Sequence, residues 1–88
     1  MAWCVYILEC ESGAYYTGST LDVNERFLLH RDGKGARYTR MDKPKRIVAT
    51  ETCDSKSAAF RLEAAIKRLS REEKRRWVAA HPYIQSEI

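Results

Sequence analysis

The sequence predicts an α/β domain of the α+β type: a small three-stranded antiparallel sheet flanked by helices, in the order β-β-α-β-α-α. Three observations lead to this fold class. Two short runs of aromatic and β-branched residues flank a turn signal at Ser12-Gly13. A third β-rich run follows near the middle of the chain. Helix-capping patterns and apolar residues at helical spacing mark the segments between and after these runs.

The first two strands are expected over residues 3–8 and 14–17, joined as a hairpin. The Gly-Ser-Thr sequence at residues 18–20 is expected to end the second strand. Tyr6 and Tyr16 lie ten residues apart, one in each run. In a hairpin, their phenol rings would lie opposite or diagonal to each other, within side-chain reach.

The middle of the chain predicts one helix, one loop and one strand. Asp22 and Glu25 have the spacing of a helix capping box, so a helix is expected from there to about Arg31. Residues 34–45 contain glycine, proline and many bases without a clean period, which predicts an exposed loop. Residues 46–53 are rich in β-branched side chains and predict the third strand.

Two helices are expected to complete the domain. Asp54-Ser55 precedes a segment whose apolar residues recur at helical spacing, namely Ala59, Leu62, Ile66 and Leu69. Ser70 and Glu73 have capping-box spacing and predict a last helix, which Pro82 ends. The domain is therefore expected to span residues 1–80, with residues 81–88 as a C-terminal tail.

Length and composition predict one globular domain without a membrane partner. The chain has 88 residues, of which 44% are hydrophobic and 32% charged. No apolar run approaches the roughly 18 residues needed to cross a bilayer, and no signal-peptide pattern is visible. Three cysteines without C-x-x-C spacing favour free thiols over disulfides or a zinc site. A cytoplasmic monomer is the default expectation, with a homodimer left open.

The basic residues are concentrated in two parts of the chain. The formal net charge is +4, yet the first ten residues carry no base. Residues 31–46 contain seven bases against two acids, and residues 61–76 contain seven against three. Such clustering is typical of a surface that binds a polyanion. A solvated charged surface is the alternative interpretation.

Three residues have the chemistry that phosphodiester hydrolysis requires. Glu63 lies mid-helix beside the apolar stripe, and a single carboxylate suffices for Mg²⁺, which retains waters and substrate oxygens as ligands. Arg26 and His30 are four residues apart on one helix and share a face, so Arg26 would hold a phosphate and His30 would transfer a proton or position water.

Each of these residues also has a purely structural interpretation. A tyrosine in a small sheet usually belongs to the core, with its hydroxyl satisfied at an edge. His30 near a helix C-terminus would interact with the helix dipole. Arg26 would be a surface charge, and Glu63 would form an i, i+4 ion pair with Lys67.

Taken together, these residues resemble the GIY-YIG nuclease family, and in particular its small stand-alone bacterial members. The resemblance extends from residue 3 to about residue 78. Cys4-Val5-Tyr6 stands where the family has Gly-Ile-Tyr, and Tyr16-Thr17-Gly18 stands where it has Tyr-Ile-Gly. The arginine, histidine and metal-binding glutamate of the family fall at Arg26, His30 and Glu63.

The resemblance implies a hydrolase that cleaves nucleic-acid strands with Mg²⁺ or Mn²⁺ held by Glu63. Tyr6, preferred over Tyr16 in this role, would help to generate the attacking hydroxide. Its phenolate would be favoured by the nearby charge of Arg26. Gly18 would allow close backbone approach at the sheet edge. Two positions depart from the family pattern: the first triplet begins with Cys4 instead of glycine, and a late asparagine that family members often carry is absent.

The basic segment is the expected nucleic-acid interface, through Lys34, Arg37, Tyr38, Arg40 and Lys43. DNA is favoured over RNA as the substrate, and repair, recombination or strand processing as the setting. Two other classes of function are weighed against this. One is a nucleic-acid-binding module that keeps the fold with weak or no catalysis, and the other is a module whose basic surface meets an acidic protein. A carboxylate in a basic cleft favours the nuclease, because it would repel phosphate in a module that only binds.

Overall fold

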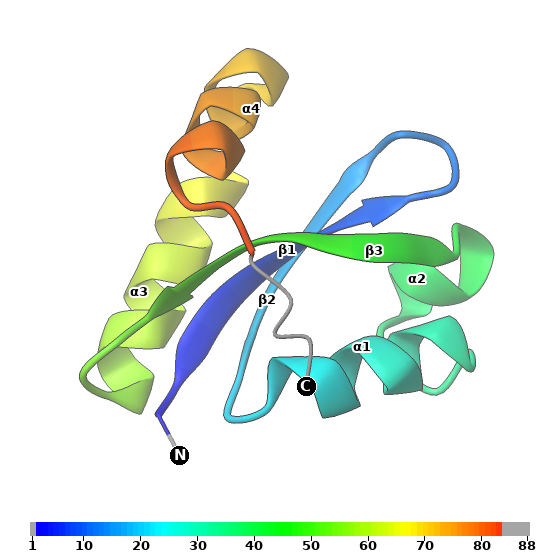
Figure 1. Cartoon of the computed structure of the whole chain (residues 1–88), viewed down its shortest axis with the longest axis horizontal. Coiled ribbons are helices and arrows are strands. Elements are labelled where there is room, and N and C mark those ends of the chain that lie inside the picture. The colour runs from blue at the N-terminus through cyan, green and yellow to red at the C-terminus, as the bar shows by residue number, and fades with distance from the viewer. Residues whose placement is uncertain (1, 84–88) are drawn as a thin grey trace.

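A computed structural model describes residues 2–83 of the chain, and Figure 1 shows its arrangement. The elements are β1 (Cys4–Cys10), β2 (Tyr15–Thr20), α1 (Val23–Arg31), α2 (Arg37–Met41), β3 (Pro44–Thr52), α3 (Lys56–Lys67) and α4 (Arg71–Ala80). The predicted α+β class and the predicted order of the main elements are confirmed. One correction concerns residues 34–45, which were expected to form a loop. They contain the short helix α2 and the first residues of β3.

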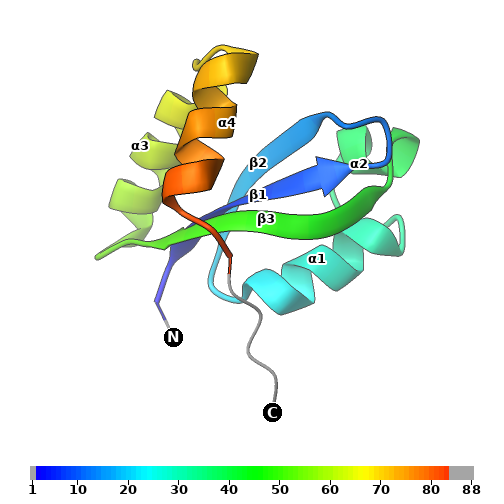
Figure 2. The same cartoon turned by 45° about the horizontal axis from the view of Figure 1, so that its top comes forward.

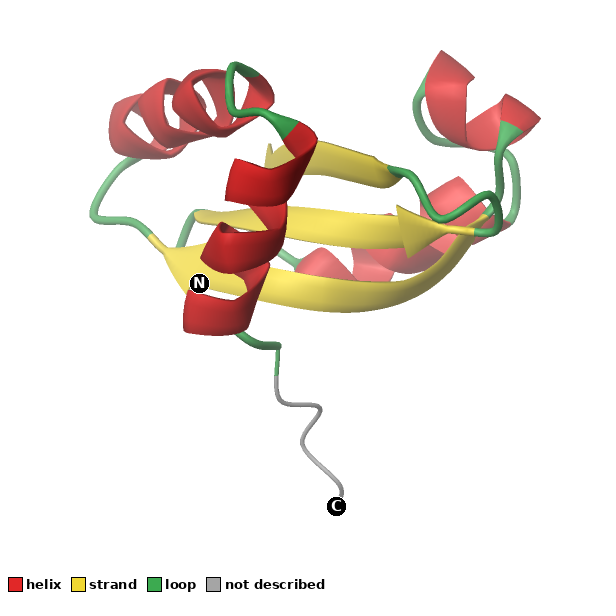
Figure 3. Ribbon diagram, turned by 90° about the horizontal axis from the view of Figure 1, so that it is seen from above, coloured by secondary structure: helices red, strands yellow, loops and turns green. Residues whose placement is uncertain are grey.

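The sheet has the strand order β2-β1-β3, and both pairs are antiparallel, as Figure 3 shows from above. Tyr6 pairs with Gly18, and Leu8 pairs with Tyr16. Tyr6 and Tyr16 are therefore diagonal neighbours on one face, which confirms the second of the two predicted arrangements. The expected end of the strand at residues 18–20 is wrong, because these residues continue the pairing with β1 to Thr20. Gly18 does not break the strand. Its missing side chain leaves room for the ring of Tyr6.

The two faces of the sheet are covered by different helices, and α3 and α4 lie on the other side of the sheet from α1 (Figure 2). On the first side, Val5 and Ile7 of β1 form the core together with Ala59 and Ile66 of α3. The alternate residues of β1 point toward α1, where Tyr6 meets His30. Because β1 is covered on both faces, its sequence is a nearly continuous apolar run and does not alternate with polar residues.

The helices begin at capping residues. Ser70 and Glu73 form the complete capping box predicted for α4. At the start of α1 only half of the predicted box forms. The Asp22 side chain accepts from the Glu25 N–H, but the Asp22 N–H donates to the Thr20 hydroxyl and not to Glu25. Thr20 lies at the end of β2, so this bond also fixes the angle at which the chain enters α1.

Residues 81–83 follow α4 and pair with the outer edge of β3. The Thr50 N–H donates to the His81 carbonyl, and the Tyr83 N–H donates to the Val48 carbonyl. These residues belong to the segment expected as a tail, and their backbone is thus docked on the sheet. Residues 84–88 lie outside the described part. Within residues 2–83, β3 is covered in this way, whereas β2 forms the other edge of the sheet.

Candidate active site

The buried centre of the site is a hydrogen bond between two side chains from different elements. The hydroxyl of Tyr6 on β1 lies 3.0 Å from Nε2 of His30 on α1, and both residues are 2% exposed. Gly18 lies directly across the strand pair from Tyr6. A Cβ placed on Gly18 would lie 2.6 Å from Cζ of Tyr6 and closer still to its hydroxyl. The Tyr6 ring therefore crosses over Gly18 toward the edge of the sheet, and only glycine fits beneath it.

The other nitrogen of His30 is held by the segment around α2. Nδ1 lies 2.7 Å from the hydroxyl of the fully buried Thr39, and that hydroxyl donates to the Ala36 carbonyl at 2.9 Å. Two groups meet Nδ1: the Thr39 hydroxyl, whose own proton goes to the Ala36 carbonyl, at 2.7 Å, and the Ala36 N–H at 3.3 Å. The shorter contact and the orientation of the Thr39 hydroxyl favour the tautomer in which Nδ1–H donates to Thr39 and Nε2 accepts from Tyr6. Gly35 permits the close approach, because a Cβ there would lie 2.7 Å from Cγ of His30. The result is a hydrogen-bonded chain from Tyr6 through His30 to Thr39.

Burial keeps both members of the Tyr6–His30 pair neutral. It lowers the pKa of His30, and the charge of Arg26 lowers it further. Burial also raises the pKa of Tyr6 strongly, with Tyr16 and Glu63 adding to the rise and Arg26 opposing it. The expected effect of Arg26, which favours the phenolate, is therefore present but is outweighed in the free protein. The phenol keeps its proton because the loss of water around a phenolate outweighs the attraction of one exposed arginine.

Glu63 lies on α3, which covers the face of the sheet opposite to Tyr6 and His30. Its carboxylate contacts the edge strand β2 at Ser19. The Ser19 hydroxyl donates to its Oε1 at 2.6 Å, and Lys67 Nζ lies 2.7 Å from Oε2. The i, i+4 pair that the sequence spacing offers is therefore present. Ser19 is the residue after Gly18, and the charge of Glu63 raises the pKa values of both Tyr6 and Tyr16. The carboxylate and the Tyr6–His30 pair thus converge on Gly18 and Ser19 of β2.

Aromatic rings continue the site toward the basic segment. The Tyr16 ring lies 5.0 Å from the His30 ring and 6.2 Å from the Tyr38 ring, with which it is nearly parallel. Tyr38 is 46% exposed. Around it on α2 and its flanks, the bases expected to bind nucleic acid are all exposed, namely Lys34, Arg37, Arg40 and Lys43. These bases flank Tyr38 along the chain, and Tyr38 connects their segment to the Tyr16 and His30 rings.

Sequence reasoning missed two positioning residues. Ser19 orients Glu63, and Thr39 orients His30, yet neither carried a signal in the sequence. Arg26 was expected, and its side chain is exposed on α1. It forms no ion pair with any residue among 2–83. It acts on Tyr6, Tyr16 and His30 through its charge.

The donor set around Glu63 fits a cation that binds mainly through substrate oxygens and water. Within residues 2–83 there is no cluster of three or more His, Cys, Asp or Glu side chains, so a closed protein cage is not formed there. Glu63 is a partly exposed carboxylate, 21% accessible, with one oxygen oriented by Ser19. Mg²⁺ is commonly held by one or two carboxylates together with phosphate oxygens, and this arrangement suits it.

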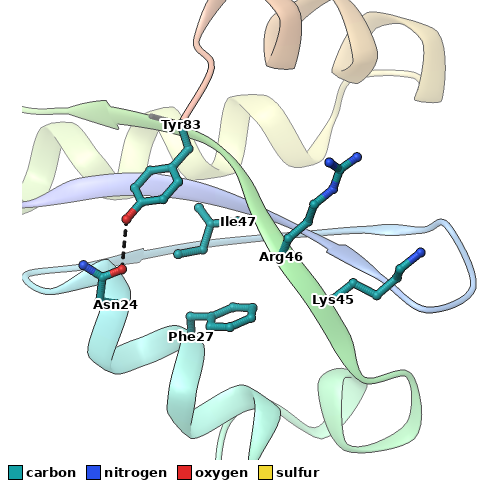
Figure 4. A pocket seen from close by; sticks show the side chains of 6 residues that line it. All are labelled: Asn24, Phe27, Lys45, Arg46, Ile47 and Tyr83. Atoms are coloured by element: carbon teal, nitrogen blue, oxygen red, sulfur yellow. Dashed lines mark hydrogen bonds between the residues drawn. The ribbon is translucent and has the colours of Figure 1, made fainter. Parts of the chain in front are cut away.

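Asn24 belongs to a separate small pocket of about 160 Å³ between α1 and β3 (Figure 4). The hydroxyl of Tyr83 donates to its side-chain oxygen at 2.9 Å. Phe27, Ile47 and the stems of two bases line the rest of this pocket. The only asparagine of the chain therefore tethers the C-terminal segment to α1 and takes no part in the hydrogen bonds at the β2 edge.

This fold and site define a small nuclease-type domain, and comparison with known proteins identifies its family. The family model described as the GIY-YIG catalytic domain matches residues 2–76. The chain therefore belongs to the GIY-YIG family, whose domains are nucleases with nucleic-acid substrates. Within residues 2–83, no helix has the length and apolar character of a membrane span.

The chain is also similar to several small UPF0213 proteins. A UPF0213 protein of Cupriavidus necator is 48% identical over 81 residues, which covers 92% of this chain and 88% of that protein. The solution structure of UPF0213 protein BH0048 from Bacillus halodurans matches with a TM-score of 0.59 at 49% identity, covering 91% of this chain and 85% of the other. That of protein EF2693 from E. faecalis matches with a TM-score of 0.62 at 29% identity, covering 98% and 96%. The chain therefore covers most of the length of each of these proteins.

Proposed function

We propose that the chain is a divalent-metal-dependent nuclease that hydrolyses phosphodiester bonds in DNA. The observation that carries this proposal is the convergence at Gly18 and Ser19 of a buried Tyr6–His30 hydrogen bond and the carboxylate of Glu63. A purely structural tyrosine and histidine would need no carboxylate at the same strand position. The proposed setting is DNA repair, recombination or strand processing in the cytoplasm.

Tyr6 and His30 together supply the general base. As the attacking water gives a proton to the Tyr6 hydroxyl, the phenol gives its own proton to Nε2 of His30. Nδ1–H of His30 stays bonded to Thr39, so the imidazolium that forms is oriented and partly stabilised. The relay avoids a free phenolate, which burial disfavours here. It also needs neutral His30 before the reaction, in agreement with its lowered pKa.

Glu63 would hold Mg²⁺ or Mn²⁺, which when bound supplies positive charge to the phosphate under attack. Ser19 keeps one carboxylate oxygen in place for this task. Arg26 and Lys67 bring two further positive charges to the same edge, where they would hold the phosphate in line. Tyr16 packs against the His30 ring and limits its motion. DNA would be gripped beyond the site by the exposed bases around α2.

One observation favours a second function, a DNA-binding module with weak catalysis. Lys67 lies 2.7 Å from the Glu63 oxygen that Ser19 does not occupy, so the ammonium already neutralises the carboxylate in the free protein. A cation would have to displace it. If the Lys67–Glu63 ion pair persists when DNA binds, the divalent cation cannot reach Glu63. Lys67 and Arg26 would still attract the DNA backbone, so the protein would bind DNA with weak catalysis.

The test is a cleavage assay on labelled single-stranded, duplex and branched DNA at low salt, with Mg²⁺, Mn²⁺ or EDTA. Glu63→Gln should abolish cleavage and leave DNA binding intact or stronger, because it removes a negative charge and retains the shape. Glu72→Gln on the exposed face of α4 is the matched control and should cut normally. Metal-dependent cleavage that survives Glu63→Gln would refute the proposed site. Salt-sensitive binding without any cleavage would establish the binding module.

A further inference from the structure

Phe60 on α3 is a large aromatic residue in an unusual position. It is 49% exposed, and it lies three residues before Glu63 on the same helix. Its ring meets the ring of Trp3 edge-on, at 5.7 Å between centroids and an interplanar angle of 81°. Trp3 itself packs against the buried core. The orientation of Phe60 is therefore fixed from one side, while much of the ring remains open to solvent.

The surroundings of this ring are basic. Lys56 Nζ lies 5.5 Å from the Phe60 centroid and 5.6 Å from the Trp3 ring. Phe60 and Ala64 line two neighbouring depressions in the surface. One of these also includes Lys56 and Arg61, and the other, of about 260 Å³, includes Glu63 and Lys67. The exposed ring thus lies between a basic surface and the carboxylate of the candidate active site.

We propose that Phe60 is a stacking platform for an unpaired nucleobase, placed beside the phosphate that Glu63 serves. This inference rests on the proposed nuclease function and adds the class of substrate: a strand with at least one unpaired nucleotide at the cleavage site. Three residues along a helix correspond to a rise of about 4.5 Å, so the platform lies close to Glu63. Ala64 in the shared wall has too small a side chain to separate the two depressions.

Base stacking requires a base whose face is free. In an intact duplex both faces of a base are covered by its neighbours, so the ring of Phe60 has no partner there. An unpaired base can stack on an exposed aromatic side chain while lysine and arginine hold the adjacent backbone. Lys56, Arg61 and Lys67 surround Phe60 in the manner expected of such a surface. The geometry therefore selects single strands, frayed ends and flaps over continuous duplex.

The charges around Phe60 favour a polyanion over a second copy of the chain. A two-fold symmetric interface through this surface would bring the Lys56 and Arg61 of one molecule against the same residues of the other. Like charges facing each other oppose association. The same cations attract a phosphate backbone, and the exposed aromatic ring then has an apolar partner in the base.

The test measures binding in EDTA, so that cleavage does not enter. The probe is a short single strand carrying 2-aminopurine, whose fluorescence reports stacking, and the comparison is the same sequence as a duplex. We expect Phe60→Leu to weaken single-strand binding by about fivefold to 150-fold and to abolish the fluorescence change. Duplex binding should be unchanged. Phe60→Trp should retain both signals, and Leu28→Ala, at a half-exposed apolar residue of α1, is the control.

Three results would overturn the inference. The first is that Phe60→Leu leaves the affinity for the single strand unchanged. The second is that Phe60→Leu lowers the affinities for single strand and duplex equally. The third is a concentration-dependent dimer in sedimentation experiments that Phe60→Leu dissociates, which would make this surface a self-association interface. Cleavage in Mg²⁺ separates the two proposals. If the protein does not cut but shows a stacking signal that depends on Phe60, the nuclease proposal is refuted and the stacking platform stands. If the protein cuts but shows no such signal, the nuclease proposal stands and the stacking platform is refuted.

Discussion

Gly18 is the position at which a single methyl group should damage the site most directly. In Gly18→Ala, the new Cβ would lie 2.6 Å from Cζ of Tyr6 and closer to its hydroxyl. Tyr6 is 2% exposed and hydrogen-bonded at 3.0 Å to His30, so its ring has no free direction in which to move. The strand or the ring must shift by several tenths of an ångström, and the Tyr6–His30 bond should break.

The expected size of the effect follows from two opposing contributions. Forcing a methyl group into a filled region destabilises by about 1–3 kcal/mol. Replacing glycine by alanine restricts the unfolded chain and offsets this by about 0.4–1 kcal/mol. The net destabilisation should lie between about 0 and 2.6 kcal/mol, and each kcal/mol lowers the Tm by roughly 4–8 °C in a domain of this size. Urea unfolding, monitored by circular dichroism, measures this destabilisation. The cleavage rate should fall by much more than the loss of folded protein accounts for.

A double-mutant cycle with Tyr6→Leu tests the cause of this destabilisation. The shorter side chain vacates the space above residue 18, so Gly18→Ala should cost at least about 1 kcal/mol less in that background than in the wild type. Equal destabilisation in both backgrounds would show that Gly18 acts through the strand backbone and not through Tyr6. A Gly18→Ala protein as stable and as active as the wild type would refute the close packing altogether.

Three further outcomes are expected. His30 has a lowered pKa in the folded protein, so the unfolded chain binds more protons below about pH 6.5; stability should fall as the pH drops from 7 toward 5, and His30→Gln should remove most of this slope, whereas an unchanged slope would show that another group causes it. Changing Lys34 and Arg37 to alanine should reduce the slope of log affinity for DNA against log salt by about one for each phosphate that the protein no longer binds, whereas an unaltered slope would place the phosphate-binding residues elsewhere. Tyr83→Phe should lower the unfolding free energy by about 0.5–1.5 kcal/mol because the bond to Asn24 is removed, as measured by urea unfolding; no change would mean that the bond contributes nothing in solution.

The sequence predicted those parts of the fold that depend on local chemistry. Ser70 and Glu73 fix the start of α4 through bonds within four residues, and the apolar spacing of α3 reflects one buried stripe. The hairpin followed from strand pairing alone, and the choice between opposite and diagonal tyrosines was settled only by the observed register. The helix α2 was missed because it has five residues and no side-chain cap at Ala36. It is held by tertiary packing, chiefly the burial of Thr39, and this leaves no periodic pattern.

The candidate site was predictable in its residues but not in its connections. Tyr6, His30 and Glu63 were each proposed from residue type and order. That His30 bonds to Tyr6 could not be inferred from the sequence, since the two residues are 24 positions apart and on different elements. Ser19 and Thr39 had no signal because serine and threonine are frequent and their role here is set by a partner distant in sequence.

The placement of the site at an edge strand has a physical reason. Side chains alternate across a strand, so Gly18 and Ser19 face opposite sides of the sheet. Gly18 accommodates the ring of Tyr6 on one side, and Ser19 holds Glu63 on the other. A single residue step therefore connects the buried Tyr6–His30 pair to the carboxylate. In a central strand these two groups would be separated by the sheet itself, and no one phosphate would reach both. At the edge strand β2, a nucleic-acid backbone that runs along the strand can contact groups from both faces of the sheet at once.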